Sequence, residues 1–373
     1  MPVWLSYPSR QTRRRGVPPP PPPTADTKHC LIYFVPGNPG FIDYYEPFLS
    51  TMRARLDEVE DKKRKDSGDD LRFHILGRNL IGFEDGDDGG GSYGPGPYDL
   101  DMQILAVWDS VANARIDLGK AGGPRHGTPF DEVVLMGHSV GSYIALDVFR
   151  RQQAAHPEGP SISKGQASAI EPVGSTSHLN LRLGVLLFAT LTHLAQSPRG
   201  QKLERMLLTT PVVSPWADVL AQAVVWWLLP VWLLAAVVRF VLRFPPHAAA
   251  VTLRFLASRG GVRQALFLGR DELRNIGPDE WEDELWEVAS AGYANEKNSK
   301  HQRPKFVILF GEDDHWVAND VRDDFIARRN AHAASRAQIL LDERGWPHDF
   351  CIRHGEEVAE TVTVWLKDLA ESL

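Results

Sequence analysis

The sequence predicts an α/β fold, in which a mostly parallel β-sheet is flanked by helices. Short apolar runs typical of buried strands alternate with segments whose apolar residues recur at helical spacing, as in βαβ units. The composition, 43% hydrophobic and 24% charged, is that of a globular protein, and 373 residues suffice for one large core. We therefore expect a single α/β domain.

The strands are expected where apolar runs end at turn-forming or charged residues. These runs cover residues 31–35, 71–76, 132–136, 183–189, 305–310 and 337–341. Helical periodicity predicts helices over residues 44–56, 100–118, 142–149, 318–330 and 356–369. The mixed charge block from Glu58 to Asp70 and the Gly- and Asp-rich stretch from Glu84 to Pro97 are expected to be loops.

Three segments do not fit this alternation. Residues 1–27 are expected to be a disordered Pro-rich arm, within which Pro18–Pro23 favours polyproline II. Residues 156–178 are rich in Ser, Gly and Pro and predict a low-complexity insertion. Residues 203–300 fall between two predicted strands and are expected to form a helical, lipid-binding cap. The folded domain then comprises residues 28–373.

Charge and cysteine content argue against several classes of function. The formal net charge of -7 disfavours nucleic acid as a partner, because phosphate binding needs a basic face. Cys30 and Cys351 lack the paired spacing of a zinc site and are expected to be reduced thiols in a cytosol-facing protein. The arginines at 13–15 precede prolines instead of an apolar segment, so no cleaved export signal is expected. No metal ion or cofactor is expected either.

The strongest chemical signal is the pentapeptide Gly-His-Ser-Val-Gly at residues 137–141. The pattern is short, but an apolar strand precedes it and a helical pattern follows, which is the context of a nucleophile elbow. The glycines permit a sharp turn that lifts the hydroxyl of Ser139 clear of the sheet, and the helix N-terminus favours a developing oxyanion. The alternative is an ordinary Gly-flanked turn. We expect Ser139 to be the nucleophile of an α/β-hydrolase fold.

A serine nucleophile needs a histidine base, and in this fold the chain order is serine, acid, histidine. His348 lies between the last predicted strand and the last helix, where the base belongs. The acid belongs in the loop after the preceding strand, which carries both Asp313 and Asp314. These positions lie beyond the carboxyl ends of strands, where open parallel sheets bind ligands. The other histidines near these motifs are expected to be structural or surface residues: His138, His315 and His354.

An oxyanion hole needs two backbone N–H donors. One is expected from Val140, the residue after the nucleophile. The other is expected from the loop Pro36–Gly40 after the first predicted strand, where Pro39 has no N–H. Asn38 is the preferred second donor and Gly40 is the alternative.

Together these motifs resemble those of the lipid droplet-associated hydrolase family. The matching residues are Pro36-Gly37-Asn38-Pro39-Gly40 with Tyr44, Tyr45 and Phe48, Gly137 to Gly141 with Tyr143, Gly311 to Trp316, and Pro347-His348 with Phe350. The resemblance extends from about Cys30 to the C-terminus, and it implies an α/β-hydrolase fold that acts on a lipid ester. It also implies residence on lipid droplets and the endoplasmic reticulum, and it favours Asp314 over Asp313 as the acid. The Pro-rich arm and the 156–178 insertion depart from the family.

The segment Val219–Leu242 is apolar nearly all round and long enough to cross a bilayer. Pro230 near its centre would divide one helix into two, which suits a monotopic hairpin inserted into one leaflet. Trp226, Trp227 and Trp232 fit the interface between lipid and water. The expected partner is therefore a lipid droplet monolayer or the cytosolic face of the endoplasmic reticulum membrane. The alternative is a buried cap helix, since core helices can also be apolar throughout.

The resulting hypothesis is a serine esterase or lipase that cleaves carboxylic esters of lipids at the droplet surface. It would form an acyl-enzyme on Ser139, with His348 as base and Asp314 as acid, and would need no cofactor. One alternative is a droplet-surface binding or organising protein with a weak or vestigial triad. Another is an acyltransferase, in which an alcohol replaces water as the acyl acceptor. The intact set of three residues favours an enzyme, but the sequence does not distinguish water from an alcohol.

Overall fold

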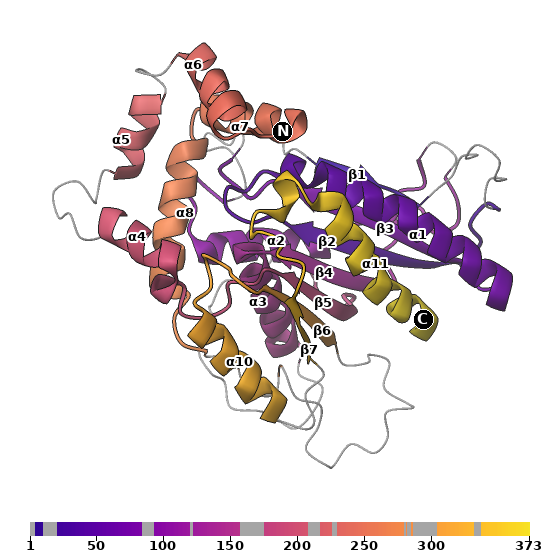
Figure 1. Ribbon diagram of the computed structural model, residues 1–373. Coiled ribbons are helices and arrows are strands. Elements are labelled where there is room, and N and C mark those ends of the chain that lie inside the picture. The colour runs from indigo at the N-terminus through magenta and orange to yellow at the C-terminus, as the bar shows by residue number, and fades with distance from the viewer. Residues whose placement is uncertain are drawn as a thin grey trace.

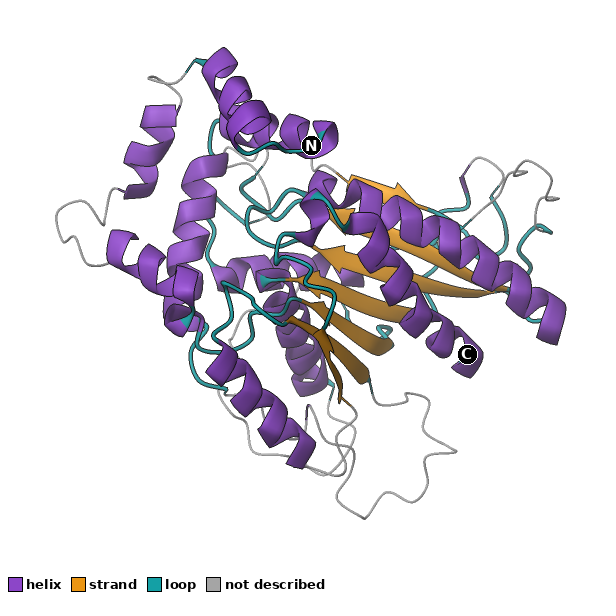
Figure 2. Ribbon diagram, viewed as in Figure 1, coloured by secondary structure: helices purple, strands orange, loops and turns teal. Residues whose placement is uncertain are grey.

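A seven-stranded sheet forms the central layer of the protein, with helices on both faces (Figures 1 and 2). This computed structural model describes residues 4–9, 21–83, 93–119, 122–156, 175–207, 217–225, 230–279, 281, 285, 304–331 and 337–373. In the order in which they lie in the sheet, the strands are β1 (Trp4–Tyr7), β3 (Leu71–Arg78), β2 (Lys28–Val35), β4 (Glu132–His138), β5 (Leu181–Leu187), β6 (Lys305–Gly311) and β7 (Ala337–Asp342). β1 pairs antiparallel to β3, and all other neighbouring strands pair in parallel. The predicted mostly parallel sheet flanked by helices is confirmed.

The helices occupy the two faces and one end of the sheet. The α-helices are α1 (Glu46–Ser67), α2 (Leu100–Ala112), α3 (Val140–Ala155), α4 (Pro198–Leu207), α5 (Ala217–Ala223), α6 (Val231–Ala236), α7 (Pro246–Ala257), α8 (Gly261–Asn275), α10 (Asn319–Ala331) and α11 (Gly355–Ser372). Short 3-10 helices are η1 (Ile42–Tyr45), η3 (Leu194–Gln196) and η8 (Phe350–Ile352), and η6 (Val237–Val241) is a π-helix. α1 and α11 pack side by side over one face, and α2 packs against α3 over the other (Figure 1).

The core lies between the sheet and these helices. Residues Cys30 to Val35 of β2 are all fully buried, as expected for a central parallel strand covered on both faces. Phe34 packs against the rings of Tyr45 and Phe48, with centroids 4.6 and 5.6 Å away. These contacts hold the end of β2, and the loop that follows it, against the start of α1.

The prediction of a disordered arm over residues 1–27 is wrong near its start. Trp4–Tyr7 forms the edge strand β1, in which Trp4 lies opposite Arg78 and Tyr7 opposite Ile75. A run of four residues followed by Pro8 is too short to show a strand period, so its order depends on pairing with β3. Pro18 and the rest of residues 10–20 lie outside the described residues.

The expected loop from Glu58 to Asp70 is also wrong, because α1 continues to Ser67. Oppositely charged side chains three and four positions apart stabilise this helix: Arg53 pairs with Asp57 and Arg64 with Asp61, each at 3.0 Å. The helix ends at Gly68, whose φ of 79° is the left-handed conformation that glycine adopts most readily.

Between β5 and β6 the described chain is helical, from α4 to α8, and these helices lie together beyond one end of the sheet (Figure 1). The apolar run 219–242 is divided at Pro230, the residue before α6, so that α5 packs on α8 while α6 packs on α7. Trp226 and Trp227 lie outside the described residues, as do residues 157–174 of the predicted insertion. In the part of the chain that the structure describes, no helix is both long and apolar enough to span a membrane.

Candidate active site

Ser139 sits on a sharp turn between β4, which ends at His138, and α3, which begins at Val140. Its φ of 55° and ψ of -126° place a non-glycine residue in a sparsely populated, strained region. The turn lies in close contact with the end of the neighbouring strand β2, since a Cβ on Gly141 would lie 2.3 Å from the carbonyl oxygen of Val35. Only a glycine fits at that position, and this is the backbone geometry of a nucleophile elbow.

The structure brings Ser139, His348 and Asp314 into one hydrogen-bonded row. His348 Nε2 lies 2.9 Å from Ser139 Oγ, and His348 Nδ1 lies 2.7 Å from Asp314 Oδ2. The second carboxyl oxygen of Asp314 accepts the N–H of Trp316 over 2.8 Å. Asp313 is exposed, and its carboxyl faces Asn319 instead. Of the two aspartates in this loop, Asp314 is the one in contact with His348.

The charge state of Asp314 follows from its surroundings. Burial raises the pKa of its carboxyl, but the charge and hydrogen bond of His348 and the N–H of Trp316 outweigh burial, so the pKa lies below its ordinary value. Asp314 is therefore a carboxylate near neutral pH, and it accepts a hydrogen bond from the protonated Nδ1 of His348. In that tautomer His348 Nε2 is an acceptor, which lets the hydroxyl of Ser139 donate to it.

The loop after β2 approaches the same serine. A Cβ on Gly37 would lie 3.0 Å from the Cβ of Ser139, whereas a Cβ on Gly40 would lie 2.5 Å from the Cβ of Leu80. Gly37, the residue before Asn38, therefore lies directly against Ser139. Val140 begins α3, so its N–H has no acceptor within that helix. The N–H groups of Val140 and Asn38, with Gly40 as the alternative to Asn38, stay a prediction for the oxyanion hole.

The side chain of Asn38 connects this loop to the helices that follow β5. Its Nδ2 donates to the carbonyl oxygen of Ala265 over 2.9 Å and to Glu272 Oε1 over 3.0 Å, both on α8. The pKa of Glu272 is raised to about 8, because burial raises it more than the hydrogen bond from Asn38 lowers it, and the charge of Asp271 also raises it. Sequence reasoning missed Glu272, because a carboxylate in the stretch Arg270–Asn275 looks like part of a solvated face.

The remaining histidines occupy different environments. His138 is buried, and its Nε2 lies 2.8 Å from the carbonyl oxygen of His348. His315 is exposed, and His354 faces Glu357 at the start of α11. Among the described residues, no group of histidine, cysteine, aspartate or glutamate side chains could hold a metal ion. Cys30 and Cys351 are buried and unpaired.

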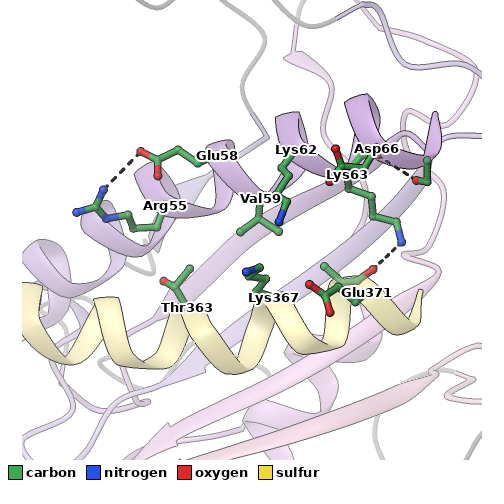
Figure 3. Close-up of a pocket in the computed structure, with 11 residues that line it drawn as sticks. Arg55, Glu58, Val59, Lys62, Lys63, Asp66, Thr363, Lys367 and Glu371 are labelled. Atoms are coloured by element: carbon green, nitrogen blue, oxygen red, sulfur yellow. Dashed lines mark hydrogen bonds and ion pairs between the residues drawn. The ribbon is translucent and has the colours of Figure 1, made fainter.

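A cavity of about 500 Å³ lies elsewhere, between α1 and α11 (Figure 3). It is lined by Arg55, Glu58, Val59, Lys62, Lys63, Asp66, Ser67, Thr363, Lys367, Ala370 and Glu371. The lining includes none of the residues around Ser139, and its charges are of both signs. We assign it no part in the chemistry of the serine.

Comparison with known proteins places the chain in a family. A family model described as lipid-droplet associated hydrolase matches residues 28–351. A lipid droplet-associated hydrolase of Rattus norvegicus is 23% identical over 357 residues, which cover 91% of this chain and 85% of the rat protein. A protein of the same name from Gallus gallus is 24% identical over 241 residues, but this match spans only 59% of the chicken protein and 64% of this chain.

A solved structure supports the fold. The peroxisomal alpha-beta-hydrolase of Saccharomyces cerevisiae superposes with a TM-score of 0.51 at 9% identity, and the alignment covers 100% of this chain and 90% of the yeast chain. At this identity the likeness concerns architecture alone, and it agrees with the parallel sheet and the elbow at Ser139 in identifying an α/β-hydrolase fold. With the family match over residues 28–351, the conclusion is that the chain belongs to the lipid droplet-associated hydrolase family.

Proposed function

We propose that the protein is a serine hydrolase that cleaves carboxylic esters of lipids through an acyl-enzyme on Ser139. The observation that carries the proposal is the row of hydrogen bonds from Ser139 through His348 to Asp314, at 2.9 and 2.7 Å. A serine hydroxyl is a weak nucleophile unless a positioned base removes its proton, and this row supplies the base and the group that orients it.

In the proposed reaction, Ser139 Oγ attacks the carbonyl carbon of the ester while its proton passes to His348 Nε2. Asp314 stabilises the imidazolium that forms. The negative charge on the carbonyl oxygen is met by the N–H groups of Val140 and Asn38. His348 then returns the proton to the departing alcohol, and water repeats the sequence on the acyl-enzyme to release the acid.

The helix α5 supports a lipid surface as the place of action, because its polar side chains face the protein and its apolar side chains face outward, the reverse of an ordinary surface helix. Its polar side chains face the protein: Gln222 Nε2 donates to the carbonyl oxygen of Ser258, Gln222 Oε1 accepts the N–H of Arg263, and Asp218 pairs with Arg263. Its apolar side chains Val219 and Leu220 face outward and are 37% and 50% exposed, and Val224, the residue after the helix, is 45% exposed. A helix with this polarity is stabilised by an apolar surface outside the protein.

The second half of the apolar run has the same property. Leu234 and Val238 are buried on one side, while Trp232, Phe240 and Val241 are 72%, 71% and 71% exposed on the other. Aromatic side chains of this kind favour the interface between lipid and water. We propose that these side chains insert into the phospholipid monolayer of a droplet or the cytosolic leaflet of the endoplasmic reticulum, in keeping with the names of the rat and chicken relatives.

The test uses purified protein, a fluorophosphonate probe and short- and long-chain acyl esters. Labelling at Ser139 and ester hydrolysis are expected, and both should vanish in Ser139→Ala. Addition of glycerol or a sterol as acyl acceptor would reveal transfer as a new ester product. A second candidate function, surface binding without catalysis, rests on the exposed apolar faces alone. Stable, folded protein that binds lipid but neither labels nor hydrolyses any ester would establish that candidate instead.

A further inference from the structure

Three hydrogen bonds, two of them buried and the third partly buried, join the loop after β2 to the loop that carries His348. The N–H of Gly37 donates to the hydroxyl oxygen of Tyr45 over 3.0 Å, and this oxygen lies 2.7 Å from His138 Nδ1. On the other side of the same ring, His138 Nε2 lies 2.8 Å from the carbonyl oxygen of His348. Tyr45 and His138 are only 3% and 4% exposed, so their side chains are largely shielded from water.

The chemistry of the groups sets the direction of every bond. A carbonyl oxygen only accepts, so His138 Nε2 must carry a proton to donate to His348. A neutral imidazole has one N–H, so His138 Nδ1 accepts and the hydroxyl of Tyr45 donates to it. Burial, followed by the nearby His348, lowers the pKa of His138 to about 3, which keeps the ring neutral near pH 7. These directions give each of the three hydrogen bonds one donor and one acceptor.

The row of three hydrogen bonds ends, on both sides, at groups whose position matters for the proposed reaction. At one end, Gly37 precedes Asn38, whose N–H is the proposed oxyanion donor. At the other end is the backbone of His348, whose ring must reach Ser139 and Asp314 together. The His138 ring packs edge-on against Phe350 at 5.0 Å and 87°, and its centroid lies 5.0 Å from that of His348. These contacts restrict sideways movement of the His348 loop.

We propose that Tyr45 and His138 are positioning residues that hold the oxyanion loop and the His348 loop in register with Ser139. Neither residue touches the reacting atoms. They act through Asn38 at one side of the site and through His348 at the other. The inference rests on the proposed function, since it concerns how the same site is assembled.

Four variants separate the parts of this chain. Tyr45→Phe removes only the hydroxyl. His138→Gln keeps an N–H near the place of Nε2, His138→Asn keeps a polar atom near the place of Nδ1, and His138→Leu keeps neither. With p-nitrophenyl butyrate as substrate, kcat should fall about tenfold in Tyr45→Phe and roughly 10- to 100-fold in His138→Asn and His138→Leu, with KM within about twofold. The kcat of His138→Gln should be at least about fivefold higher than that of His138→Leu, because the glutamine can still donate a hydrogen bond to the His348 carbonyl oxygen.

Tyr33→Phe is the matched control. Tyr33 is fully buried on β2, and its hydroxyl donates to Ser110 Oγ over 2.8 Å, on the side of the sheet covered by α2. It should lower the melting temperature as Tyr45→Phe does but leave kcat unchanged. Unchanged kcat in Tyr45→Phe, or an equal loss in Tyr33→Phe, would overturn the proposal. If His138→Leu does not fold, Tyr45→Phe and the comparison of His138→Gln with His138→Asn still decide.

Fluorophosphonate labelling separates this proposal from the proposed function. If the wild-type protein is not labelled at Ser139, the proposed function itself fails. If the wild type is labelled and Tyr45→Phe is labelled at the same rate, the serine is reactive but the positioning role is refuted. Slower labelling of Tyr45→Phe, with recovery from His138→Leu to His138→Gln, supports the positioning role.

Discussion

Gly137 and Gly141 lie so close together that a Cβ on Gly137 would sit 2.2 Å from the carbonyl oxygen of Gly141. No side-chain rotation relieves this clash, because the Cβ is attached to the backbone and the contacted atom is backbone too. The spacing of the two glycines around Ser139 therefore reflects steric exclusion at the turn.

From this contact we predict that Gly137→Ala displaces Ser139 and strongly reduces ester hydrolysis. The backbone must shift to relieve the overlap, and overpacking of a tight core typically destabilises by about 1–3 kcal/mol. Hydrolysis and thermal melting are the measurements. Gly122→Ala is the control, since no atom lies within 4 Å of a Cβ there although its φ is 61°. Wild-type activity in Gly137→Ala would contradict the packing of the elbow.

The choice between the two aspartates gives a second prediction. Asp314→Asn should lower kcat by up to about 10⁴-fold, as the loss of the orienting carboxylate does in a well-studied serine protease, because the amide favours the wrong tautomer of the histidine. Asp313→Asn should change kcat by less than about twofold, because its exposed carboxyl does not contact His348. Steady-state kinetics on both variants decide between them, and a dead Asp313→Asn with an active Asp314→Asn would reverse the assignment.

Much of the fold could be predicted because its signals are local. Strands buried on both faces, such as residues 30–35, are necessarily apolar runs, and the elbow needs glycines at fixed spacing. Topology then brings the carboxyl ends of β4, β6 and β7 to one edge of the sheet, so Ser139, Asp314 and His348 could be named before their distances were known.

Features that depend on distant contacts could not be predicted. Trp4–Tyr7 is a strand only because β3 offers it an edge. His138 and Tyr45 are 93 positions apart in the sequence, and nothing in either local pattern shows that they share a hydrogen bond. The burial of Glu272 could not be predicted for the same reason. It results from the contact between α8 and Asn38, which are far apart in the sequence.

Glu272 gives the third prediction, which concerns pH. Burial raises its pKa from 4.5 to about 8, so the folded protein retains a proton that the unfolded chain releases. The contribution of Glu272 to the free energy of unfolding is complete below pH 4.5 and is lost as the pH rises toward 8. Glu272→Gln keeps an uncharged acceptor for Asn38, so its stability relative to the wild type should increase between pH 5 and 8 by a few kcal/mol, at about 1.4 kcal/mol per pKa unit.

Denaturant unfolding of both proteins at pH 5 and pH 8 measures this difference. Glu356→Gln is the control, since it makes the same chemical change at an exposed position in the first turn of α11. Its stability relative to the wild type should be equal at the two pH values. A Glu272→Gln effect that is also equal at pH 5 and pH 8 would show that the carboxyl is ionised in the folded state.

The last prediction concerns the exposed apolar side chains on α5 and on α6 with η6. Trp232→Asp combined with Phe240→Asp should release the protein from phospholipid-coated oil droplets and from vesicles. A charge replaces apolar area of large, mostly exposed rings, and partition into lipid depends on that area at about 25 cal/mol per Å². Leu220→Asp tests α5 separately. Co-flotation with droplets is the measurement, alongside hydrolysis of a short, water-soluble ester.

Val364→Asp is the matched control, because Val364 is 57% exposed on α11, which covers one face of the sheet instead of joining the helices between β5 and β6. It should float with droplets as the wild type does. The variants on α5 and α6 should retain hydrolysis of the soluble ester while losing hydrolysis of esters held in droplets, because the substituted side chains are exposed and are not part of the hydrogen-bonded row at Ser139. If the double variant still floats with the droplets, lipid binding must involve another part of the chain.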